Sequence, residues 1–267
     1  EGTTPIYMAA HKGHVDAIRV LANAGADLNG AMNTAITHRH VDAIRALAEA
    51  GADLVAALNY AAGNGYVDEI FALTELGANV NAAADDGSTP VLMAAFNGHE
   101  EAIRALAGLG ADVNTPANDG ATPVFMAAQQ GHHLAIQVLH ALGADVNTAM
   151  SDGTTPIHIA AAACIATATG NLTPIKVLIQ FNADVRARDN KGRTPFDAAQ
   201  KAQDNLIKDL EEVPFSTNDL AEVLEAQYCE FKKIAEVLKN AGCFKSFHHL
   251  YPTVFRSTNL GGYGITR

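Results

Sequence analysis

The chain has 267 residues, of which 48% are hydrophobic and 18% charged, so it can bury a substantial core and is expected to fold. Its formal net charge of −11 argues against nucleic acid as a partner, because phosphate backbones are themselves anionic. The sequence has no 18-residue apolar run, basic amphipathic stretch or recognisable signal peptide, which predicts a soluble protein that does not bind membranes.

An internal repeat organises the chain. The tripeptide Gly-Ala-Asp, or its equivalent place, recurs at intervals of 26, 26, 33, 33, 39 and 60 residues. Its copies begin at Gly25, Gly51, Gly77, Gly110, Gly143, Asn182 and Gly242. Such periods are typical of architectures in which each unit needs its neighbours to cover an apolar flank.

One full unit reads DDGSTPVLMAAFNGHEEAIRALAGLGADVN, and each part of it has a physical role. Thr89 suits an N-cap and Pro90 the first helical position, so a helix is expected to start there and to end at Gly98. EEAIRALAGLG then predicts a second helix with Gly110 at its C-terminal cap. The turn formers that follow predict an extended, hairpin-like finger between units.

These residues resemble the ankyrin repeat, whose pattern D-G-x-T-P-L-H-x-A-A-x-x-G-H has a period of about 33 residues. The resemblance covers about residues 2–244. It implies an all-α solenoid of stacked antiparallel helix pairs with short β-hairpin fingers. We expect seven units followed by a capping tail at 245–267, with the units at 1–29, 30–55, 56–81, 82–114, 115–147, 148–186 and 187–244.

The second and third units are seven residues shorter than the fourth. Their helix sequences survive, so the loss falls between Leu28 and Met32 and again between Leu54 and Leu58. We therefore expect these two units to lack the finger, which would leave a notch that widens the concave face. Asn33 and Asn59 are then expected near the start of the first helix of each unit.

The last two units carry insertions. The sixth predicts a protruding loop near residues 167–171, and the seventh gains about 27 residues, which predicts that both of its helices are elongated. The tail is expected to pack on the end of the solenoid, although a docking segment for a partner is the alternative. Its apolar anchors would be Phe247, Leu250, Tyr251, Val254 and Phe255.

Histidines and cysteines are the first candidates for chemistry. The resemblance gives His14, His40, His99 and His132 a structural role in tying the turn between helices. The neighbouring pairs at 38/40 and 132/133 lack a third ligand, so no metal site is expected. Cys164, Cys229 and Cys243 fit neither a disulfide framework nor a zinc knuckle, which indicates inert thiols in a reducing compartment. We expect no cofactor.

Catalytic motifs are missing from the sequence: it contains no G-x-S-x-G, P-loop, dinucleotide fingerprint or H-E-x-x-H. What varies between units is instead free to form a binding surface, which in ankyrin proteins is the concave face made by finger tips and first-helix positions. Leu92 and Phe125 could equally fill gaps between helices. Carried over position by position, the surface comprises Tyr7, His11, Lys12, Asp85, Asp86, Ser88, Leu92, Phe96, Asn97, Asn118, Asp119, Phe125, Gln129, Gln130, Ser151, Asp152 and His158.

The sequence thus predicts a non-enzymatic, monomeric, cytoplasmic scaffold that binds another protein. One rival is the recruitment module of a larger enzyme or of a bacterial effector delivered into a host cell, and the start at Glu1 favours such a fragment. Another rival is a substrate role, because Asn114 and Asn147 resemble the ankyrin asparagines that oxygen-dependent hydroxylases modify.

Overall fold

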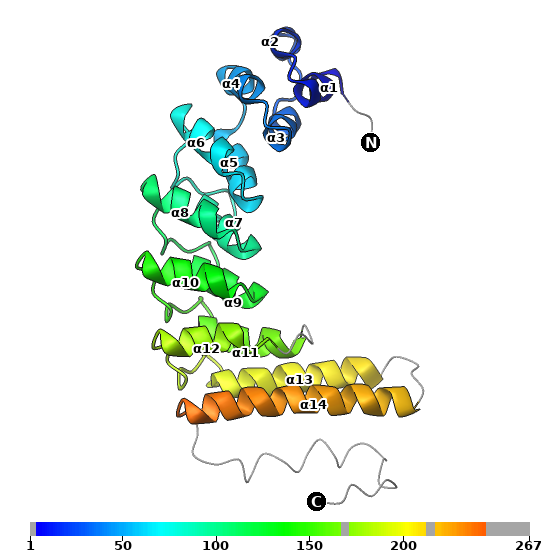
Figure 1. The fold of residues 1–267 in the computed structure, drawn as a ribbon, viewed down its shortest axis with the longest axis vertical. Helices are drawn as coiled ribbons and strands as arrows, with labels where there is room; N and C mark the ends of the chain where they lie inside the picture. Colours follow the sequence, from blue (N-terminus) through cyan, green and yellow to red (C-terminus); the bar gives the residue numbers. More distant parts are fainter. Residues whose placement is uncertain (1–3, 167–170, 212–216, 244–267) are drawn as a thin grey trace, which may run out of the picture.

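The computed structural model describes residues 4–166, 171–211 and 217–243, with side chains omitted for 210–228. This part of the chain forms fourteen helices in seven consecutive antiparallel pairs and no strand. The stack is curved, and the first helix of each pair, from α1 to α11, lies on its concave side (Figure 1). These inner helices, with the seventh at the end of the stack, are α1 Pro5–Lys12, α3 Asn29–Thr37, α5 Leu54–Gly63, α7 Pro90–Asn97, α9 Pro123–Gln130, α11 Pro156–Ala166 and α13 Pro195–Glu211.

The second helix of each pair lies on the outer side of the curve. The outer helices of the first six pairs pack through an isoleucine that recurs at one place in each of these pairs and is fully buried. These residues are Ile18, Ile44, Ile70, Ile103, Ile136 and Ile175. The outer helices are α2 Val15–Asn23, α4 Val41–Glu49, α6 Val67–Glu75, α8 Glu100–Gly108, α10 His133–Ala141, α12 Thr173–Gln180 and α14 Thr217–Asn240.

Local capping signals set the bounds of the helices in full units. On α7, the Thr89 hydroxyl accepts the Leu92 N–H at 3.3 Å, and Pro90 is the first helical residue. Gly98 ends the helix in the left-handed conformation at φ 72°, which glycine adopts without a steric penalty. The predicted start and end of this helix are therefore confirmed.

The fingers of the fourth to seventh units are tight turns that touch one another. In the fifth unit, Ala117 N–H donates to Ala121 O at 2.9 Å, which closes a hairpin too short to form a strand. Asn118 N–H donates to Asp86 O of the preceding finger at 3.1 Å, and Ser151 N–H donates to Asp119 O at 3.1 Å. The fingers thus form one hydrogen-bonded row.

The second and third units lack fingers, as predicted. Both α3 and α5 begin where a finger would otherwise stand, and Asp53 caps α5 by accepting Val55 N–H at 2.9 Å. The expectation that Asn33 and Asn59 lie near helix starts was wrong. Without the Thr-Pro start signal the helices extend upstream, so both asparagines lie well inside them.

The seventh pair closes the stack with long helices, α13 of 17 and α14 of 24 residues. The inner helix α13 packs along α11, and Phe196 on α13 contacts Phe231 on α14 with ring centroids 5.4 Å apart. Most of the loop expected at 167–171 and the whole tail at 245–267 lie outside the described residues. The boundaries between units remain a prediction.

Candidate binding surface

The inner helices expose one face along the stack. On α7, Val91, Leu92, Ala94 and Ala95 are buried, whereas Phe96 is 37% exposed. Residues three and four apart share a helix face, so Met93, Phe96 and Asn97 stand together on the exposed side. The inner helix therefore buries Val91, Leu92 and two alanines, and its largest apolar side chain, Phe96, stays on the exposed side.

The same register continues on neighbouring inner helices. Met93, Met126 and Ile159 lie four positions after the N-cap threonines of their helices and are half-buried. Tyr60 aligns with them, six positions before the place of the Gly-His histidine, and is also half-buried. Met93 lies close to Gly63 of the preceding helix. Together with the exposed Phe96 they form a row that we call the apolar stripe, defined as Tyr60, Met93, Phe96, Met126 and Ile159.

Sequence reasoning found only Phe96 of this stripe. The signal for two others was available, because Met93 and Met126 occupy the same place in consecutive 33-residue units. Met8 occupies that place in the first unit and is 45% exposed. Thr34 takes the place in the second unit and is buried, so the stripe does not run on to Met8.

The predicted finger residues are exposed but take part in the fold. Each of Asp86, Asp119 and Asp152 uses one carboxylate oxygen to accept a backbone N–H of its own turn, at 2.8–2.9 Å. Hydrogen bonds from Ser88 lower the pKa of Asp86, and those from Thr154 lower the pKa of Asp152. The fingers therefore present fixed negative charges at neutral pH.

Asn118 and Ser151 also serve the row of fingers. The Asn118 side-chain amide donates to Asp85 O at 2.8 Å, and the Ser151 hydroxyl donates to Asp119 O at 2.8 Å. Asp85 itself is exposed, and Ser88 is half-buried. These residues align one finger on the next and leave their outer surface open.

Three residues of the surface expected from the sequence are buried instead. Leu92, Phe125 and His158 have exposed fractions of 2%, 3% and 1%, so a partner cannot reach them in the folded solenoid. They take the place of the ankyrin histidine, which points between inner helices. Leu92 and Phe125 fill that space with carbon, as the alternative interpretation held.

His158 is the one residue that keeps the histidine of the ankyrin pattern, and it forms hydrogen bonds through both ring nitrogens. Its Nδ1 accepts the Thr155 N–H at 3.3 Å and lies 2.7 Å from the Thr155 hydroxyl. A backbone N–H can only donate, so the proton sits on Nε2, which donates to Arg193 O at 2.9 Å. Where Asp197 replaces the histidine, its carboxylate accepts the Thr194 N–H and hydroxyl, both at 2.8 Å.

The remaining predicted residues fall into two groups. Phe96, Asn97, Gln129 and Gln130 lie on α7 and α9, which pack against each other, so the structure brings them together. A second group on α1, two fingerless units away, consists of Tyr7, His11 and Lys12. The structure does not join this group to the fingers.

Two of the Gly-His histidines, His40 and His99, contact a backbone carbonyl of the preceding unit. His99 Nε2 lies 3.0 Å from Gly63 O, and His40 Nε2 lies 3.1 Å from His11 O. His11 and His38 rings lie 4.2 Å apart. Burial, then the nearby His38, Lys12 and His40, lowers the pKa of His11.

Candidate catalytic and metal chemistry is weak in the described part of the chain. No group of three or more His, Cys, Asp or Glu residues there is placed to hold a metal ion. Burial, then the charge of Glu230, raises the pKa of the Cys164 thiol to about 11, which keeps it protonated and unreactive. No described helix combines the length and apolarity needed to cross a bilayer.

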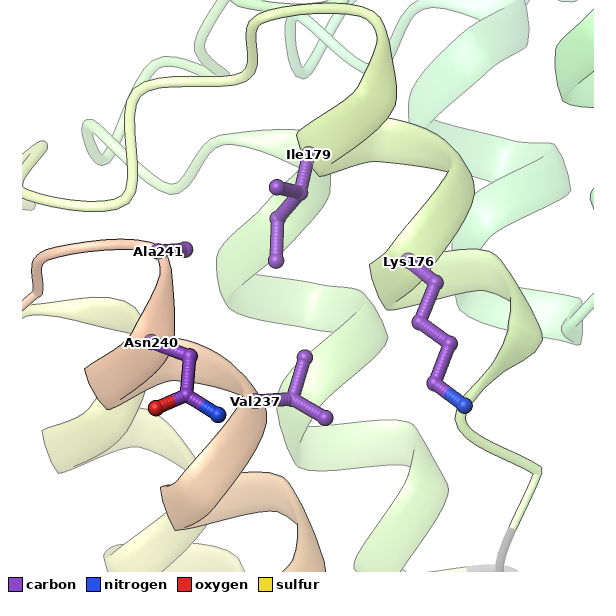
Figure 2. Close-up of a pocket in the computed structure, with 5 residues that line it drawn as sticks. All are labelled: Lys176, Ile179, Val237, Asn240 and Ala241. Atoms are coloured by element: carbon purple, nitrogen blue, oxygen red, sulfur yellow. The ribbon is translucent and has the colours of Figure 1, made fainter.

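One groove of about 340 Å³ opens between the outer helices α12 and α14. Figure 2 shows Lys176 and Ile179 of α12 facing Val237 and Asn240 of α14. It lies on the outer helices, away from the apolar stripe, and its lining has a single ionisable side chain. That lining suits neither a metal nor acid–base catalysis.

Asn114 and Asn147 link units through their amides. The Asn114 amide donates to Gly143 O at 3.3 Å and accepts Asp145 N–H at 2.9 Å, and Asn147 does the same with Asn182 O at 3.2 Å and Asp184 N–H at 2.7 Å. Hydroxylation of either residue stays a prediction.

Family models agree with this architecture. The model described as "Ankyrin repeats (3 copies)" matches residues 1–57, 55–117 and 109–165, and the model described as "Ankyrin repeat" matches residues 152–190. The chain belongs to the ankyrin repeat family, whose members generally mediate protein–protein interaction. No curated protein sequence matches the chain.

Proposed function

We propose that this solenoid is a non-enzymatic scaffold that binds a partner protein through the apolar stripe and the adjoining finger tips. The observation that carries the proposal is the stripe itself: large apolar side chains remain accessible along four consecutive inner helices. Aromatic residues and methionine are enriched in protein interfaces, and methionine adapts to varied partner shapes.

The proposed binding surface is the one expected from the sequence without its buried residues. Phe96 and Asn97 on α7 and Gln129 and Gln130 on α9 would contact the partner directly. The fingers would supply polar contacts at the rim, from Asp85, Asp86, Ser88, Asn118, Asp119, Ser151 and Asp152. Tyr7, His11 and Lys12 on α1 would form a separate contact for a partner long enough to cross the fingerless units.

Site-specific photo-cross-linking tests the proposal. A benzophenone amino acid in place of Met126 on α9 should cross-link a cellular protein under ultraviolet light. The same probe in place of Leu134, which is 50% exposed on the outer helix α10 of the same unit, is the matched control. Equal cross-linking from both positions would show that the inner face has no special role.

A second candidate function is recruitment within a larger protein, either an enzyme or a bacterial effector that acts in a host cytoplasm. It uses the same surface but places the chemistry outside these 267 residues. Sequencing the complete gene decides between the two, because a catalytic or translocation segment would be visible there.

A further inference from the structure

Charge is distributed unevenly along the solenoid. Between residues 46 and 175, Arg104 is the only Lys or Arg, whereas thirteen Asp and Glu residues lie in the same span. Arg104 lies on the outer helix α8, next to Glu101 at 3.8 Å. The inner helices α5, α7, α9 and α11 therefore carry no positive Lys or Arg side chain.

The negative charge that faces the apolar stripe sits on the fingers. Asp85, Asp86, Asp119 and Asp152 are exposed and lie immediately before inner helices α7, α9 and α11. Turn hydrogen bonds hold Asp86 and Asp152 ionised, as their lowered pKa values show. The apolar stripe thus has an acidic border along one edge.

Backbone hydrogen bonding favours one conformation for a peptide bound on the apolar stripe. The described inner face offers no strand edge, so an extended peptide could not add to it as a paired strand. A helix satisfies its own backbone N–H and C=O groups internally. Residues seven apart on a helix are separated by about 10.5 Å, close to the roughly 8–10 Å between packed inner helices.

We propose that the apolar stripe binds an amphipathic helix that has apolar residues at heptad spacing and Lys or Arg residues along the edge facing the fingers. This inference rests on the proposed function and adds the chemistry of the partner. The apolar side chains would contact Met93, Phe96 and Met126, and the basic ones would lie against Asp85 and Asp119.

Fluorescence anisotropy with a synthetic probe tests the pairing. The probe is a labelled three-heptad peptide of Leu, Ala and Lys, compared with an otherwise identical peptide that has Glu for Lys and with a scrambled Leu, Ala and Lys peptide. We expect the Lys helix to bind at least about tenfold more tightly than either control, and increased salt to weaken it. Equal binding of the Glu or scrambled peptide would overturn the inference.

Matched variants locate the binding. Phe96→Ser on α7 should weaken the Lys helix about tenfold, whereas Phe71→Ser, on the outer helix α6 with a similar exposed fraction of 43% against 37%, should not. Asp85→Asn should reduce the salt dependence of Lys-helix binding, whereas Glu75→Gln on α6 should leave that dependence unchanged. Equal losses within either pair would overturn the inference, and circular dichroism checks that each variant is folded.

The two proposals fail in different ways. If Met126-site cross-linking captures a protein but the Lys helix does not bind, the partner chemistry is wrong and the binding face stands. If neither experiment finds the inner face occupied, the proposed function itself is wrong.

Discussion

Arg39 and Glu69 replace two residues that are small in the other units, and we predict that they depend on each other. Arg39 stands where Gly13, Gly65 and Gly98 stand elsewhere, and it keeps their left-handed conformation at φ 58°. Glu69 stands where the outer helices α2, α4, α8 and α10 have alanine, and its side chain is only 2% exposed. Arg39 Nε lies 3.7 Å from Glu69 Oε1.

The structure sets the size of the coupling. Glu69 Oε2 is buried without a hydrogen-bond partner, so removing Arg39 leaves a buried carboxylate with less compensation. Breaking a fully buried pair costs about 3–5 kcal/mol, but the Arg39 side chain is 62% exposed, so solvent screening reduces this to about 1–2 kcal/mol. Against that loss, glycine at 39 relieves about 1 kcal/mol of left-handed backbone strain.

A double-mutant cycle measures the coupling. Arg39→Gly should change the free energy of unfolding by less than about 1 kcal/mol in the natural chain, because the two effects oppose each other. In a Glu69→Ala background the strain remains together with the exposed Arg39–Asp68 pair at 3.9 Å, which contributes little, so the same change should stabilise by up to about 1 kcal/mol. Urea unfolding followed by circular dichroism supplies the four values. Additivity within about 0.5 kcal/mol would refute the reasoning.

Three further predictions concern other parts of the fold. Gly120→Ala should lower the free energy of unfolding by about 2–3 kcal/mol, whereas Gly110→Ala should lower it by only about 1 kcal/mol. Both glycines have positive φ, but only at position 120 would a Cβ lie 2.8 Å from the backbone of the next finger. Equal losses of stability in urea unfolding would contradict this. The lowered pKa of His11 means that the unfolded chain binds more protons. The contribution of His11 to the stability of α1 should therefore be fully present above pH 6.5 and lost as pH falls through the folded pKa. Hydrogen exchange of α1 between pH 7.5 and 5.5 measures this, and an unchanged pH dependence in His11→Gln would argue against it. The exposed Cys229 should react with a thiol reagent at pH 8 while buried Cys164, with its pKa of about 11, reacts only after unfolding; rapid labelling of Cys164 in the folded protein would exclude the assignment.

The sequence predicts the parts of this fold that depend on local signals. Thr89, Pro90 and Gly98 mark a helix because capping acts within one turn, and the 26-residue spacing shows where fingers are missing because a count needs no coordinates. Asn33 was misplaced for the converse reason: with the start signal gone, only tertiary packing decides how far upstream the helix extends.

The binding surface was predicted less well, because burial depends on how one helix is turned against the next. Leu92 and Met93 are adjacent in sequence, and both are apolar, yet one faces the core and the other the stripe. The contact between Arg39 and Glu69 joins residues thirty positions apart in units that depart from the common pattern. Neither the orientation of Leu92 and Met93 nor the pairing of Arg39 with Glu69 can be predicted from the sequence, because both depend on how neighbouring units stack.

Affinity capture with matched double variants tests the central claim most directly. The natural chain is compared with Phe96→Ser/Met126→Ser on the inner helices and with Phe71→Ser/Leu134→Ser on the outer helices, where the replaced side chains are at least as exposed. The account predicts that a protein captured by the natural chain is retained by the outer variant and lost from the folded inner variant. Retention by the inner variant, with loss from the outer one, would contradict it.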